Sequence, residues 1–324
     1  MSCRSPERDV SSANPIGGGG SEAGVRVTLE ELIGLRRAVP RRSLSGAHPV
    51  RSLASGQSRS RERGRGIEFE EMRLYQPGDD IRAIDWRASA RLGRPFTKLF
   101  GEERERSVFV AVDQRSGMFF GSRTTFKSVV AARTATLACW TALARGDPVG
   151  GLVAGERLVS VRAARERGAV LGLIDALTTA NRALSAHAPA GVALERVLTD
   201  CLAHATDGST IVLFSDFGDY ESDLGTLLAA LARRRRLVLV GIDDPLEARL
   251  DVTGRVGISD GREHRAVWLT RRSRARYQAG RAARAARLAR DASDCGATLR
   301  HLSTERAPTA LDIEALLGGR GSLA

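Results

Sequence analysis

The sequence is poor in cysteine and has no apolar run approaching the roughly 20 residues that span a bilayer. Its four cysteines lie far apart and form no C-x-x-C pair, which excludes a disulfide framework and a zinc ribbon. Cys139 and Cys201 fall in apolar helical patterns, so we expect buried free thiols there. The first twenty residues are polar and glycine-rich and lack a secretory apolar region, and we expect a soluble, cytoplasmic protein.

Lysine is almost absent. Lys98 and Lys127 are the two lysines among 50 basic residues, which leaves 48 arginines and a formal net charge of +12. Such a balance is typical of nucleic-acid-binding proteins. Heavy arginine, alanine and glycine use is also typical of GC-rich coding, where arginine replaces lysine on solvated surfaces. Both interpretations stay open, and the second receives more weight.

Three catalytic signatures are missing from the sequence: the G-x-x-x-x-G-K-[ST] phosphate loop, the G-x-S-x-G nucleophile elbow and the H-E-x-x-H zinc motif. The five histidines show no spacing typical of metal ligands. None of these three kinds of catalytic or nucleotide site is therefore predicted.

Composition divides the chain into four parts. Residues 1–25 are rich in glycine and serine and are predicted to be disordered. Residues 26–65 predict a helix over 27–39, with Thr28 as its N-cap, followed by a basic linker. That linker is either an anion-binding arm or a solvated connection, and the second is favoured. The other two parts are a charged segment with a β-hairpin extension (66–105) and a regular domain (106–318).

The last part predicts an α/β fold. Nearly continuous apolar strands such as SVFVAVD and STIVLFSDF alternate with helical patterns, including 124–145 and 271–294. This alternation indicates a mostly parallel central sheet with helices on both faces. The strand-like segments 95–100 and 106–113 flank the polar string GEERE and are predicted to pair as a hairpin. The arginines of 271–294 are interpreted as a solvated helix face.

Acidic residues stand at the carboxyl ends of two predicted strands, where ligands of parallel sheets bind. Asp113 ends the first strand, Ser116 follows in its loop, and Asp216 ends another. Two carboxylates with hydroxyl and water oxygens suit Mg²⁺. The alternative is that the carboxylates cap helix N-termini.

A dense run of alternating charges precedes the regular domain. Its string R-L-Y-Q-P-G-D-D-I-R-A-I-D-W spans residues 73–86, and Pro-Gly at its centre suits a type II turn. The segment is interpreted either as a protein-binding surface or as a structural clip, and the two are compatible. The candidate interaction residues are Arg73, Tyr75, Asp79, Asp80, Arg82, Asp85, Trp86 and Arg91.

This string, together with Gly66–Phe69, Ser215–Phe217 and Asp243–Glu247, resembles the signature of domain-of-unknown-function family 58. The resemblance implies a von Willebrand factor A-like fold with a metal ion-dependent adhesion site. It also implies genes that neighbour those of MoxR-type AAA+ ATPases, and a role with these ATPases in assembling or maturing other proteins. No enzymatic activity is implied.

The sequence departs from the adhesion-site pattern Asp-x-Ser-x-Ser. Arg115 and Gly117 occupy the two serine positions, and no threonine lies in 191–194, where the family's metal-binding threonine is expected. We therefore expect a degenerate site and no cofactor, with Mg²⁺ as the ion it would otherwise take. The expected function is a non-enzymatic adaptor that works with a MoxR-type ATPase and an unknown client. Alternatives are a nucleic-acid-binding protein using the arginine-rich arm and helix, and a metal-dependent hydrolase.

Overall fold

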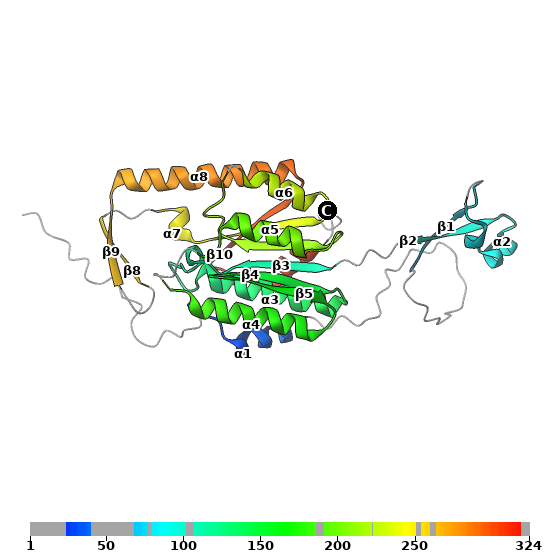
Figure 1. The fold of residues 1–324 in the computed structure, drawn as a ribbon, viewed down its shortest axis with the longest axis horizontal. Helices are drawn as coiled ribbons and strands as arrows, with labels where there is room; N and C mark the ends of the chain where they lie inside the picture. The colour runs from blue at the N-terminus through cyan, green and yellow to red at the C-terminus, as the bar shows by residue number, and fades with distance from the viewer. Residues whose placement is uncertain are drawn as a thin grey trace, which may run out of the picture. The chain divides into compact units, whose positions relative to one another are not determined.

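The computed structural model describes residues 24–39, 68–76, 79–101, 107–185, 191–221, 223–250, 254–259 and 264–318 of the 324-residue chain. They fall in two compact units (Figure 1): one comprises 1–41 and 107–324, the other 42–106. The predicted disordered tail lies outside the described residues except for its last two positions, and the basic linker 40–65 lies wholly outside them.

A six-stranded sheet forms the centre of the larger unit, in the order β10-β7-β6-β3-β4-β5. Five strands run parallel, and the edge strand β5 pairs antiparallel with β4. The strands are β3 (Val108–Asp113), β4 (Val149–Ala154), β5 (Leu158–Ala164), β6 (Thr210–Ser215), β7 (Arg236–Asp243) and β10 (Thr298–Ser303). Every residue of β3 and β4 is buried, as their apolar runs predict.

Helices cover both faces of this sheet (Figure 1). Successive side chains of β3 alternate between two cores: Val110 packs in the core with α3, α4 and α9, and Phe109 packs in the core with α5, α6 and α8. The predicted α/β architecture is confirmed. The helices are α3 (Lys127–Arg145), α4 (Arg167–Ala183), α5 (Leu194–His204), α6 (Leu224–Ala232), α7 (Pro245–Ala248), α8 (Arg271–Asp294) and α9 (Ala310–Leu317).

The N-terminal helix belongs to this unit rather than to a separate segment with the linker. α1 (Leu29–Gly34) continues into a 3-10 turn (Leu35–Ala38), and the Thr28 side chain accepts the N–H of Glu31 as its predicted cap. Leu32 is fully buried in the core beside α3. The helix therefore completes one layer of the domain.

The smaller unit contains β1 (Glu68–Leu74), a 3-10 turn (Ile81–Ala83), α2 (Trp86–Leu92) and β2 (Phe96–Gly101). β2 pairs antiparallel with β1, whereas β3 lies between β4 and β6. The predicted pairing of 95–100 with 106–113 is therefore wrong. An all-apolar strand such as β3 needs neighbours on both sides, so it enters the large sheet, and β2 pairs with the charged strand before it.

A two-stranded antiparallel sheet precedes α8 in the larger unit. β8 (Gly254–Ser259) pairs with β9 (His264–Leu269), and the residues that join the two strands lie outside the described residues. No helix in the described ranges is both long and apolar enough to cross a membrane.

Candidate functional site

The strand order reverses between β3 and β6, and the loops that leave these strands meet at their carboxyl ends. Asp113 ends β3, and Asp216 directly follows β6. An ideal Cβ placed on Gly117 would lie 3.2 Å from Oδ2 of Asp216, so the two loops touch. The structure thus brings both predicted carboxylates to the same carboxyl edge of the sheet.

The Asp113 carboxylate is held by its own loop. Arg115 donates from Nε to Oδ1 at 2.9 Å and from Nη2 to Oδ2 at 2.7 Å, and the Arg115 backbone N–H also reaches Oδ1. Ser215 Oγ donates to Oδ2 at 2.6 Å. Asp113 and Arg115 are both buried, so the pair is a desolvated, bidentate ion pair.

Arg115 also binds residues of two other loops. Its Nη2 donates to Asp219 Oδ1 at 3.0 Å, and Nη1 donates to the carbonyl of Val192. Burial acts to lower the pKa of Arg115, but Asp113 and Asp219 raise it above its ordinary value. The Leu194 N–H reaches Asp219, so the 191–194 loop, where the family's threonine is expected, does close on this site.

A second cation, Lys127, binds the carboxylate that follows β6. Lys127 begins α3, and its ammonium donates to Asp216 Oδ2 at 2.8 Å and to both oxygens of Glu247 at 2.9 and 3.0 Å. The Lys127 side chain is 1% exposed. Burial lowers the pKa of Lys127, yet the two carboxylates raise it above its usual range. Burial raises the pKa of Asp216, while Lys127 and the Gly218 N–H hold it lower than usual.

These contacts do not fit a divalent cation. The oxygens of Asp113 are engaged by Arg115 and Ser215, and Asp216 is engaged by Lys127. The Ser116 hydroxyl forms no hydrogen bond to either carboxylate within the described chain. A metal would have to displace two cations that the protein itself supplies.

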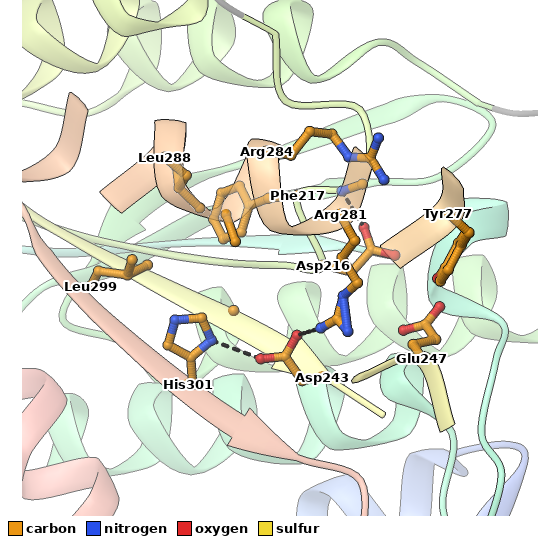
Figure 2. Close-up of a pocket in the computed structure, with 13 residues that line it drawn as sticks. Asp216, Phe217, Asp243, Glu247, Tyr277, Arg281, Arg284, Leu288, Leu299 and His301 are labelled. Atoms are coloured by element: carbon orange, nitrogen blue, oxygen red, sulfur yellow. Dashed lines mark hydrogen bonds and ion pairs between the residues drawn. The ribbon is translucent and has the colours of Figure 1, made fainter. Parts of the chain in front are cut away.

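A pocket opens beside Asp216, between the ends of β7 and β10 and helix α8 (Figure 2). Asp243 lies at its floor, accepting a hydrogen bond from Arg281 and interacting with Nδ1 of His301 at 2.7 Å. Arg281 and Arg284 line the pocket, and Arg281 pairs with Asp243, so the interpretation of the α8 arginines as a solvated face is wrong for Arg281. The helix needs a polar contact here because β7 ends in a carboxylate.

The smaller unit places the other candidates on a short, capped helix. The Asp85 side chain accepts the N–H groups of Arg87 and Ala88 as the N-cap of α2. Asp80 accepts the N–H of Arg82, and Asp79 accepts that of Gln76. Each carboxylate thus shapes its own local backbone. The Asp79 N–H also bonds to the Gln76 carbonyl at 3.0 Å, while the predicted turn residues Pro77 and Gly78 lie outside the described residues.

Large apolar side chains of this unit face solvent. Trp86 is 66% exposed and Ile81 is 63% exposed. Among the remaining candidates Tyr75 is half-buried, Arg82 and Arg91 are exposed, and Arg73 lies in β1 with its side chain outside the described residues.

Sequence reasoning missed Lys127, Asp219 and Glu247 as partners of the strand-end carboxylates. Lys127 carried a usable signal, because it is one of two lysines in an arginine-rich chain. Asp219 and Glu247 carried none beyond their position after a strand. Their roles depend on which loops meet at the sheet edge.

The fold and this site define an α/β domain with buried ion pairs where its strand order reverses. The sequence matches the model of the family described as protein of unknown function DUF58 over residues 71–288, which is more than half of the chain. The chain belongs to that family, and the resemblance stated from its charged string is confirmed.

Relatives and solved structures give further similarities. Uncharacterized proteins of Mycobacterium bovis and Mycobacterium tuberculosis are each 29% identical over 253 residues, covering 75% of this chain and 76% of the relative. The conserved hypothetical protein BatB from Bacteroides thetaiotaomicron has 12% identity and a TM-score of 0.44, over 65% of this chain and 95% of that one. A von Willebrand factor type A protein from Catenulispora acidiphila has 16% identity and a TM-score of 0.32, over 46% and 35%.

Proposed function

We propose that the chain is a non-enzymatic adaptor that binds a MoxR-type AAA+ ATPase and assists it in assembling or maturing a client protein. The contact surface is the exposed face of the smaller unit, at Trp86 and Ile81. The observation that carries the proposal is the exposure of these two large apolar side chains; Leu74 and Leu92 of the same unit are exposed as well. Exposed apolar side chains with arginines at their rim are typical of protein interaction sites.

The local structure supports a pre-formed surface. Asp85 caps α2, Gly93 ends it in the left-handed conformation with φ 68°, and Ser89 Oγ accepts the Phe96 N–H at 2.8 Å. A surface that is already ordered loses little conformational entropy when a partner binds. The exposed arginines Arg82, Arg87 and Arg91 favour an acidic face on the partner.

The class of the partner follows from the family resemblance, in which such genes neighbour those of MoxR-type ATPases. The absence of enzymatic activity is part of the proposal, and the ion pairs at the strand ends support it. Asp113 and Asp216 are the carboxylates that a hydrolase would use, and both are engaged by protein cations. The proposal accordingly includes no metal cofactor.

The test is binding of a MoxR-type ATPase from the same organism, measured by biolayer interferometry on the full chain. Trp86→Ala should weaken binding by about 30-fold, because a central tryptophan contributes about 2 kcal/mol or more. Circular dichroism should stay native because Trp86 is mostly exposed. The matched control is Trp268→Ala, which removes another exposed tryptophan, 74% exposed and in the larger unit, and should leave binding unchanged. Equal binding by wild type and Trp86→Ala would contradict the proposal.

Asp85→Ala serves a different purpose. Because Asp85 caps α2, its replacement should cost about 1 kcal/mol of local stability, and weaker binding by this variant would report the fold of the helix. Trp86→Ala therefore carries the decision, and Asp85→Ala measures how far binding depends on a folded α2.

A further inference from the structure

Helix α8 carries an unusual concentration of charge. Eight arginines lie between positions 271 and 290, and the first acidic residue of the helix is Asp291. Arg281 pairs with Asp243, and the other seven form no ion pair within the described chain. Elsewhere exposed arginines do find partners, as Arg234 does with Asp207. The helix therefore carries seven arginines whose charge the described protein leaves un-neutralised.

This arrangement opposes the stability of the helix itself. Like charges three or four residues apart repel, as at Arg271 with Arg274 and at Arg272 with Arg276. Cations in the first helical turn also oppose the helix dipole. A capping box between Thr270 and Ser273 secures the end of the helix despite this charge. An external anion would relieve the repulsion.

An aromatic ring lies next to the same charge. Trp268, in β9 and three residues before the first residue of α8, is 74% exposed. In the register of β8 and β9 it stands opposite Arg255, which is also exposed. An exposed aromatic ring opposite Arg255 and close in sequence to Arg271 combines a stacking platform with phosphate-binding groups.

We infer that α8, Trp268 and Arg255 form a binding surface for single-stranded nucleic acid. The guanidinium groups bind backbone phosphates with their planar pairs of N–H donors, and Trp268 stacks on a base. The 24 residues of α8 rise over about 36 Å, enough to follow several successive phosphates.

The same helix does not suit a membrane surface. A helix that lies in the lipid interface needs a broad apolar face turned outward. The only leucine of α8, Leu288, is buried against the protein core, and apart from Tyr277 the exposed positions are arginine or small and polar residues. An acidic protein segment lacks bases for Trp268 to stack on. Nucleic acid is therefore the occupant that uses both features.

The experiment measures fluorescence anisotropy of a labelled oligothymidylate of about 20 nucleotides with the full chain, over a series of salt concentrations. Wild type should bind, with an affinity that falls steeply as salt rises. The triple variant Arg271→Gln, Arg272→Gln, Arg276→Gln should weaken binding about tenfold or more and reduce the salt slope by about 2, since each lost phosphate contact removes about 0.7. Trp268→Ala should weaken binding without changing the salt slope.

A matched control removes the same charge elsewhere. Arg157, Arg162 and Arg182 are exposed arginines of the same unit without an ion pair to the described residues, and their replacement by Gln should change binding less than twofold. Equal losses in the two triple variants would reduce the effect to net charge and overturn the inference. So would absence of binding by wild type, tighter binding of poly-glutamate than of the oligonucleotide, or binding only to phosphatidylglycerol vesicles.

Discussion

Arg115, two residues after Asp113, binds both oxygens of the Asp113 carboxylate, with Nε donating to Oδ1 at 2.9 Å and Nη2 donating to Oδ2 at 2.7 Å. Both side chains are buried at the end of the central strand β3. The sequence places Arg115 where the adhesion-site pattern expects a serine, and the structure gives that replacement a physical consequence. A carboxylate that could have bound an ion from solution is instead half of an internal ion pair.

Breaking that pair should be costly. Arg115→Ala leaves Asp113 buried and without its cation, and should lower the free energy of unfolding by about 3–5 kcal/mol. The measurement is urea denaturation followed by circular dichroism. Arg123→Ala is the control, because Arg123 is exposed and pairs with Glu305 at 3.8 Å, so its loss should cost less than about 1 kcal/mol. Adding Asp113→Asn to Arg115→Ala should restore part of the loss, and no restoration would argue against an unpaired charge as its cause.

The position of Lys127 should prevent Mg²⁺ from binding to Asp216 and Glu247. In wild type the ammonium occupies the space between Asp216 and Glu247, so calorimetric titration with Mg²⁺ should show no micromolar binding. Lys127→Ser frees both carboxylates and should produce weak, millimolar Mg²⁺ binding, because Mg²⁺ is held by one or two carboxylates and retained waters. Lys127→Arg keeps a cation and should bind none. Micromolar binding by wild type that disappears in Asp113→Ala would contradict this account.

His301 and Asp243 should make stability depend on pH. The hydrogen bond to Asp243 raises the pKa of His301 above its ordinary value, although burial and Arg281 oppose the shift. The folded chain thus binds this proton more tightly than the unfolded chain. The stabilisation is complete below about pH 6.5, the unfolded value, and is lost as pH rises through the raised pKa. Its size should be about 0.2–1 kcal/mol, because the His301 side chain is 56% exposed.

The measurement compares urea midpoints between pH 6 and pH 9. His301→Gln should flatten the decline in stability that wild type shows over this range. His204→Gln removes an exposed histidine at the end of α5 and should keep the wild-type slope. A decline that persists unchanged in His301→Gln would assign the pH dependence to other groups.

Much of the larger unit could be predicted, because burial on both faces leaves an unmistakable pattern. The run SVFVAVD can only be an interior strand, and Gly146 with φ 88° ends α3 where the sequence predicts. The buried thiols of Cys139 and Cys201 follow from the same apolar periodicity, and burial raises the pKa of each to about 12. The core residues can therefore be predicted from the local apolar pattern of the sequence.

The pairing of β1 with β2 and the partners of the strand-end carboxylates were harder to predict, for a physical reason. β1 reads E-F-E-E-M-R-L, a charged strand without clear alternation, so its pairing with β2 gave no local signal. The partners of Asp113 and Asp216 lie up to 102 residues away along the chain, as Ser215 does from Asp113. Which loops meet at a sheet edge follows from strand order, and strand order is not written in any one segment.

The N-terminal helix offers the sharpest test of how the larger unit is held together. Leu32 is fully buried, and Trp140 Nε1 of α3 donates to the Leu32 carbonyl at 3.2 Å. Leu32→Ala should lower the free energy of unfolding by about 2–5 kcal/mol, through lost apolar burial and the cavity left behind. Ile33→Ala is the control, because Ile33 is the adjacent apolar residue yet 39% exposed, and it should cost clearly less. Because α1 packs directly on α3 and α4, the unfolding transition of Leu32→Ala should stay single and move to lower urea. A second, separate transition would show instead that α1 unfolds independently of the sheet.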